Sequence, residues 1–213
     1  MTKNATLTVQ DIDPIYGVNY KRGYIGFVYY ADHIVSRGIA YFTRWARIED
    51  VKVSHCFIVA CKGDVIEALL RPGVVVDRIG KYFEDPTCQI FFRKPRGWTP
   101  ALADAIIATA ARQVGEKYDL ALIIAQAMQG LYLGRVINRL FRGRPDEFVS
   151  RLIDNPAKWI CSELVSYCLD EQPELRDRGI LAKPVNTIDP QELFVDAEVF
   201  EPWQHSAPDG AQA

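Results

Sequence analysis

The sequence predicts a single α+β domain built on an antiparallel β-sheet. Its 213 residues are enough for one sizeable hydrophobic core. Hydrophobic residues make up 49% of the chain and charged residues 24%, as in ordinary globular proteins. Segments that favour strands cluster early and segments that favour helices come late, an order typical of α+β folds. We expect this domain to span residues 1–205, followed by a small, polar and disordered tail over 206–213.

Strands are expected where β-branched and aromatic residues lie between turn-forming residues. These segments are 24–30, 51–60, 64–70, 74–76 and 89–92, with a short terminal strand over 197–202. The second and third segments form a hairpin around Lys62 and Gly63.

Helices are expected over 32–45, from residue 100 and over 160–169, whereas 184–193 is expected to be a loop. Thr99 and Pro100 supply a capping hydroxyl and a first-turn proline, and Gly115 ends that helix. Its apolar stripe is Leu102, Ile106, Ala110 and Val114. The stripe of the last helix is Ile160, Leu164, Val165, Cys168 and Leu169.

Charge and composition narrow the classes of function. The net charge of −2 shows no basic excess that would indicate nucleic-acid binding. The first residues lack the apolar core of a signal peptide, and no run of about 18 uncharged apolar residues predicts a membrane span. Five cysteines without framework-like spacing indicate reduced thiols. We therefore expect a cytoplasmic protein, with export by a signal-independent route left open.

His55 and Glu67 are the polar residues that stand out in the predicted strands. Alternation places His55 on the same strand face as Phe57 and Val59. A three-residue turn, 61–63, would place Glu67 opposite Phe57 and diagonal to His55, within reach of both side chains. We expect Gly63 to take the left-handed position of that turn. A two-residue turn would instead separate the pair, and Glu67 would be a solvent-facing residue of an edge strand.

Cys161 is the candidate nucleophile because it opens a predicted helix. The positive end of the helix dipole favours a thiolate there, and the free backbone N–H could bind an oxyanion. The alternative is a buried cysteine acting as a small hydrophobe, which suits Cys168 in the core stripe. Cys56, Cys61 and Cys88 lie on or beside strands and are interpreted as structural. A zinc site would need short paired spacings, which the cysteines and histidines lack.

Two segments resemble circularly permuted NlpC-type papain-like cysteine peptidases, the YiiX/YaeF-like branch, and more distantly the lecithin:retinol acyltransferase family. The segment CSELV from Cys161 resembles the nucleophile motif, and SHCFIVA from Ser54 resembles the histidine strand. The cysteine follows the histidine, as in the permuted branch. Residues 115–119 look like the family's tyrosine segment and 186–190 like the loop after its cysteine helix. The stretch before His55 lacks the glycine-aspartate strand start of many relatives.

This resemblance implies a papain-like fold, no cofactor and a catalytic triad. Cys161 would attack a carbonyl carbon, His55 would move the proton and Glu67 would orient the imidazole. The substrate-contacting residues expected from the resemblance are Tyr118, Ser54 and Ser162. Tyr118 has the alternative role of a packing residue at the start of a helix.

A hydrophobic helical insertion is expected over 119–158, between Tyr118 and Cys161. Its segment Leu120–Arg144 is too short to span a bilayer but could lie on one or hold an acyl chain. Four arginines follow the apolar part, namely Arg135, Arg139, Arg142 and Arg144. A buried helix with a solvated arginine end is the alternative.

The function expected from the residues and the resemblance is thiol-dependent hydrolysis or acyl transfer on an amide or ester bond. The substrate would be a lipid or N-acyl compound, or a cell-wall-type peptide. Alternatives are a non-catalytic lipid- or protein-binding module that keeps the fold, and a structural protein that associates through the apolar helix. In the binding-module alternative Cys161 would be an ordinary thiol.

Overall fold

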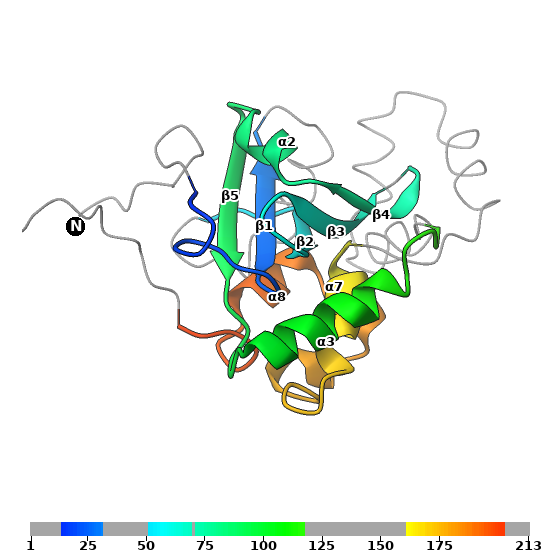
Figure 1. Cartoon of the computed structure of the whole chain (residues 1–213). Helices are drawn as coiled ribbons and strands as arrows, with labels where there is room; N and C mark the ends of the chain where they lie inside the picture. Colours follow the sequence, from blue (N-terminus) through cyan, green and yellow to red (C-terminus); the bar gives the residue numbers. More distant parts are fainter. Residues whose placement is uncertain (1–13, 32–50, 70, 118–160, 203–213) are drawn as a thin grey trace, which may run out of the picture.

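The computed structural model describes residues 14–31, 51–69, 71–117 and 161–202, and its five-stranded antiparallel sheet with packed helices confirms the α+β class (Figure 1). The strands are β1 (Ile25–Tyr30), β2 (His55–Val59), β3 (Asp64–Leu69), β4 (Gly73–Arg78) and β5 (Cys88–Arg93). Their order across the sheet is β4-β3-β2-β1-β5. Both strands that carry the candidate site, β2 and β3, are therefore interior strands.

Two of the four described α-helices begin where the sequence supplies a capping side chain and a first-turn proline. They are α2 (Gly80–Phe83), α3 (Pro100–Ala111), α7 (Cys161–Asp170) and α8 (Pro190–Val195), with 3-10 turns η2 (Gly179–Ala182) and η3 (Val185–Thr187). The Thr99 hydroxyl caps α3 by accepting a hydrogen bond from the Leu102 N–H at 3.1 Å, as expected. In Figure 1, α3 and α7 lie side by side, and α2 lies apart from them.

The sheet has an apolar layer on each face, because alternate residues of a strand point to opposite sides. Cys56 and Ile58 of β2 pack in the cluster that contains the buried residues of α3, α7 and α8. Phe57 and Val59 pack in a second cluster with Tyr82 of α2. Neighbouring residues of β2 therefore face different helices, which matters for the site at its first residue.

The β2–β3 hairpin has the three-residue turn that places Glu67 near His55. Ile58 pairs with Ile66, and the Ala60 N–H donates to the Asp64 carbonyl at 2.9 Å, so residues 61–63 form the turn. The expectation for Gly63 was wrong, since this glycine does not have a positive φ. The turn is therefore closed by ordinary backbone conformations, and its Gly63 carbonyl accepts from the Ile79 N–H at 2.9 Å.

Two expectations near the C-terminus were wrong. Residues 184–193 are not a loop, because Asp189 caps α8 by accepting from the Glu192 N–H at 2.8 Å and Pro190 fixes the first turn. Residues 197–202 contain an isolated bridge, Pro95–Phe200, in place of a strand. The Asp196 carboxylate accepts from the Val199 N–H at 2.7 Å, and the Val199 carbonyl and Glu201 N–H pair with the backbone of Arg96 and Lys94.

Several expectations fall outside the described residues. These are the helix over 32–45, the insertion over 119–158 with Leu120–Arg144, and the tail over 206–213. Among the residues that the structure describes, no helix has the length and apolar character needed to cross a membrane.

Candidate active site

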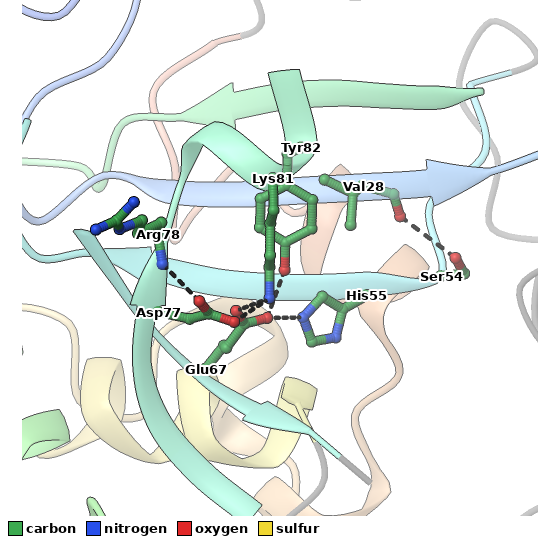
Figure 2. Close-up of polar contacts among 8 residues, drawn as sticks. All are labelled: Val28, Ser54, His55, Glu67, Asp77, Arg78, Lys81 and Tyr82. Carbon is green, nitrogen blue, oxygen red and sulfur yellow. Dashed lines mark hydrogen bonds and ion pairs between the residues drawn. The ribbon is translucent and has the colours of Figure 1, made fainter. Parts of the chain in front are cut away.

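His55 and Glu67 meet between the two interior strands. The His55 Nε2 lies 2.7 Å from Glu67 Oε2, and Figure 2 shows the ring pointing at the carboxylate. The Glu67 side chain is completely buried and that of His55 is 17% exposed. A buried carboxylate without hydrogen-bond donors would be strongly destabilising, so the surroundings of Glu67 decide what charge it can hold.

Two residues of α2 also hydrogen-bond to the Glu67 carboxylate. The sequence alone did not predict either contact. The Lys81 ammonium lies 2.5 Å from Glu67 Oε1, and the Tyr82 hydroxyl donates to Oε2 (Figure 2). Lys81 also pairs with Asp77 at 2.7 Å. Burial alone would raise the pKa of Glu67, but His55, Lys81 and Tyr82 together lower it to about 2. Glu67 is therefore a carboxylate at neutral pH.

Cys161 reaches His55 from the α7 side of the sheet. The β2–β3 ladder ends at the pair Ile58–Ile66, and strand alternation turns the Cys56 N–H toward the β3 side beyond it. Cys56 and the His55 ring are the polar neighbours of Cys161 there, because the thiol and backbone N–H of Cys56 and the charge of His55 lower its pKa. The end of the ladder thus leaves a place where the first residue of α7 meets two consecutive residues of β2.

The charges of Cys161 and His55 support each other. Hydrogen bonds from Cys56 and the positive charge of His55 hold the pKa of Cys161 well below its usual value, although burial opposes this. Burial alone would lower the pKa of His55, but the Cys161 thiolate and Glu67 raise it to about 10. At neutral pH the two groups form a thiolate–imidazolium pair, the reactive form of a nucleophilic cysteine.

Cys56 belongs to the site, although its place on a strand indicated only a structural thiol. It is fully buried, and its pKa is raised well above the usual value by burial and by the neighbouring Cys161. It therefore stays a neutral thiol that donates to its neighbour. The available sequence signal was its position directly after His55, which places it on the face toward the helix that begins at Cys161.

The three residues expected to contact the substrate have different surroundings from one another. Ser54 is 4% exposed, and its N–H and hydroxyl both donate to the Val28 carbonyl, which fixes the start of β2 (Figure 2). Ser162 is fully buried, and its hydroxyl has no hydrogen-bond partner among the described residues. Tyr118 lies outside the described residues, although the preceding segment is tied to β4 by the Val74 N–H and the Glu116 carbonyl at 2.8 Å.

Helix α8 supports the segment that leads into β2. The fully buried Gln191 accepts a hydrogen bond from the Val53 N–H at 3.0 Å. The Asp189 cap is partly buried, and burial raises its pKa to about 6 in spite of its hydrogen bond with Glu192. A helix far along the chain therefore holds the backbone two residues before His55.

The described residues offer no metal centre. In these parts of the chain no group of three histidine, cysteine or carboxylate side chains is placed to hold a metal ion. All five cysteines are free thiols. The ionisable side chains grouped at Cys161 are a thiol, an imidazole and a carboxylate.

The chain matches no protein family, no curated protein and no solved structure.

Proposed function

We propose that this protein is a thiol hydrolase or acyltransferase that works through Cys161, His55 and Glu67. The observation that carries the proposal is the grouping of three ionisable side chains: the His55 Nε2 lies 2.7 Å from Glu67 Oε2, and His55 and Cys161 shift each other's pKa toward the charged forms. A structural cysteine would need no such partners, and a buried imidazolium held between two anions is an unusual arrangement for packing alone.

The proposed reaction is acyl transfer through a thioester. The Cys161 sulfur attacks the carbonyl carbon of an ester or amide, a C–S bond forms and the carbonyl electron pair moves to oxygen. The Cys161 N–H, at the start of α7, is available to that oxyanion. The tetrahedral intermediate then collapses, and His55 gives its proton to the leaving alcohol or amine. Water or an amine, deprotonated by His55, finally attacks the thioester and releases the thiol.

The proposed fold is papain-like with the circularly permuted NlpC-type order. Support comes from the chain order, in which the histidine strand β2 precedes the cysteine helix α7, and from Glu67 on the neighbouring strand. The opening of α7 at Cys161 also fits the resemblance of CSELV to a nucleophile motif. We therefore assign the described sheet and α7 as the catalytic half of such a fold.

The proposed substrate is a lipid or N-acyl compound, with a cell-wall-type peptide as the second class. The apolar segment Leu120–Arg144 favours the first class, as an acyl-chain site or a peripheral membrane contact. The proposed reaction needs no cofactor and involves no nucleic acid. A cytoplasmic location is part of this proposal.

The first experiment is the pH dependence of iodoacetamide labelling at each cysteine, measured by mass spectrometry. We expect Cys161 to react at pH values well below the ordinary cysteine pKa of about 8.5. His55→Ala should reduce its labelling at pH 6 by about tenfold or more, since the thiolate loses its counter-charge. Cys61, the exposed cysteine, is the internal reference. Equal rates at Cys161 and Cys61 in the wild-type protein would contradict an activated thiol.

The second experiment is turnover of p-nitrophenyl esters and N-acyl amides of increasing chain length. We expect Cys161→Ala to abolish turnover and Cys61→Ser to preserve it, and His55→Ala to reduce kcat by roughly 100-fold or more. A preference for long acyl chains would favour the lipid class. If Cys161→Ala binds acyl lipids as well as the wild type does and neither protein turns them over, the binding-module alternative holds.

A further inference from the structure

Two thiols, not one, meet at the candidate site. Cys161 opens α7, and Cys56 lies on β2 with its side chain in the cluster that packs against α7. Helix α7 packs directly against β2, and each of the two thiols shifts the pKa of the other. The packing of α7 on β2 thus brings the Cys56 thiol to the proposed nucleophile, whereas the acyl-transfer mechanism does not use Cys56 as a reacting group.

The two sulfurs are chemically matched for oxidation. Cys161 is the anionic partner, and a thiolate is the form of cysteine that peroxides oxidise. Cys56 is the neutral partner, with a pKa raised by burial and by the negative charge of Cys161. Oxidation of Cys161 removes that negative charge, so one of the causes that keep Cys56 protonated disappears at the moment when Cys56 is needed as a nucleophile.

We propose that Cys161 and Cys56 form a reversible disulfide when a hydroperoxide oxidises the site, so that Cys56 acts as the resolving thiol. This inference rests on the ionised Cys161 of the proposed function, but it does not require acyl transfer. The disulfide switches the nucleophile off and protects it from irreversible oxidation.

The chemistry balances in two steps. In the first, the Cys161 thiolate attacks one peroxide oxygen, an S–O bond forms, the O–O bond breaks, and His55 supplies the proton that leaves with the alcohol or water. In the second, Cys56 loses its proton and its sulfur attacks Cys161, so that an S–S bond forms and the S–O bond breaks with loss of water. Two thiols and one hydroperoxide give one disulfide, one alcohol or water and one further water. A cellular dithiol reverses the reaction by thiol–disulfide exchange.

The other cysteines lack this arrangement. Cys168 is fully buried seven residues further along α7, and burial raises its pKa. Cys88 lies on the edge strand β5, where burial and the negative charge of Asp85 raise its pKa to about 12. Cys61 is exposed in the hairpin turn and hydrogen-bonds to Asp64 at 3.2 Å. It therefore provides a control that is exposed but has no neighbouring thiol among its described contacts.

The test is peptide mapping of the full chain after reduction, desalting and treatment with one equivalent of hydrogen peroxide at pH 7. Trypsin releases Cys56 with Cys61 in peptide 53–62, and Cys161 with Cys168 in peptide 159–176, so fragment ions must assign the linked pair. We expect a Cys56–Cys161 crosslink that dithiothreitol removes. Cys61→Ser should retain it.

Cys56→Ser is the decisive variant, because its hydroxyl can still donate to the Cys161 sulfur but cannot form a disulfide. With excess peroxide we expect it to accumulate sulfinic and sulfonic acid at Cys161 at least tenfold faster than the wild type. Equal over-oxidation in both proteins, or a crosslink through Cys61, would overturn the inference. Cys56→Ala provides a second variant if the serine protein does not fold.

The outcomes separate this inference from the proposed function. If iodoacetamide labels Cys161 at pH 6 but peroxide gives no crosslink, the resolving role of Cys56 fails and the thiolate stands. If the crosslink forms but no ester or amide is turned over, acyl transfer fails and the dithiol site stands. If Cys161 reacts like the other cysteines in both assays, both proposals fail.

Discussion

At the scale of single residues, the charge of Glu67 is set by three donors rather than by one. His55, Lys81 and Tyr82 all hydrogen-bond to its carboxylate, which has no exposed surface. Because a buried carboxylate is stabilised only while these donors remain, Glu67 couples the site to the stability of the fold. Its substitution should therefore affect both the reactivity of Cys161 and the pH dependence of unfolding.

Glu67→Gln is expected to weaken the dependence of the unfolding free energy on pH at acid pH. The pKa of Glu67 is about 2 in the folded protein and about 4.5 when unperturbed, so its stabilisation is complete above pH 4.5 and is lost as pH falls toward 2. At 1.36 kcal/mol per pKa unit the lost stability is roughly 3 kcal/mol. Urea unfolding of both proteins at pH 6 and pH 3 measures the difference. Glu201→Gln, which changes a surface pair with Lys94, should show the same loss of unfolding free energy between pH 6 and pH 3 as the wild type.

Lys81→Met is expected to raise the pKa of His55. The Lys81 ammonium partly offsets the negative field of Glu67, so its removal leaves the imidazolium better stabilised. Glu67→Gln should have the opposite effect and lower this pKa. Proton NMR of the ring protons measures both shifts, and His55→Ala assigns the signal among the three histidines of the chain. A downward shift in Lys81→Met would contradict the assigned role, while Lys183→Met, at a remote surface pair, should cause no shift.

At the scale of elements, the position of α2 is set by aromatic packing against β2. Phe57 stacks on Tyr82 with ring centroids 4.7 Å apart, and Gly26 lies opposite Phe57 on β1. A Cβ atom at Gly26 would overlap the Phe57 ring. The absence of a side chain at Gly26 therefore lets Phe57 hold Tyr82 against Glu67.

Gly26→Ala is expected to weaken both the core and the site. The displaced Phe57 ring should cost about 1–3 kcal/mol of unfolding free energy, the usual range for overpacking. The shift passed to Tyr82 should also slow Cys161 labelling at pH 6. Thermal unfolding and the labelling assay measure the two effects. Gly63→Ala is the matched control, because nothing lies within 4 Å of the added Cβ and its backbone is not left-handed.

The sequence was informative where local rules decide the structure. The strands and their hairpin were expected, but a two-residue and a three-residue turn were both left open. The observed three-residue turn sets the register that brings Glu67 to His55. The capping rule that placed α3 at Thr99 also applies to Asp189, Pro190 and Glu192, although that segment was predicted to be a loop. The capping signal for α8 is therefore present in the sequence, but a helix of six residues is too short to show a helical periodicity.

The rest of the site depends on packing between distant segments. Lys81 and Tyr82 reach Glu67 from the four-residue helix α2, and a sequence pattern does not show where so short a helix points. The role of Cys56 depends on where the β2–β3 ladder ends and on which residue of α7 arrives there. Such contacts are set by tertiary structure and leave no periodicity in the sequence.

At the scale of the whole molecule, the sheet and the C-terminal segment are joined by one buried arginine. Arg93 of β5 is 4% exposed, and its guanidinium donates to the carbonyls of Phe194, Asp196 and Glu201. Its guanidinium also lies over the rings of Phe194 and Phe200. This clamp holds α8 against the sheet, and α8 in turn holds the Val53 backbone before His55 through Gln191.

Arg93→Lys is therefore expected to destabilise the fold although the charge is kept. An ammonium cannot reproduce the planar set of donors, so at least one carbonyl bond is lost at about 1.5–3 kcal/mol. Urea unfolding measures the loss, and limited proteolysis should show earlier cleavage in residues 194–201. Arg96→Lys is the matched control, because exposed Arg96 donates to the Ala197 carbonyl of the same segment. If both variants unfold at the same urea concentration as the wild type, the C-terminal segment is held by its apolar contacts and not by the clamp. If Arg93→Lys alone is destabilised and also slows Cys161 labelling, the Arg93 hydrogen bonds support the site through α8.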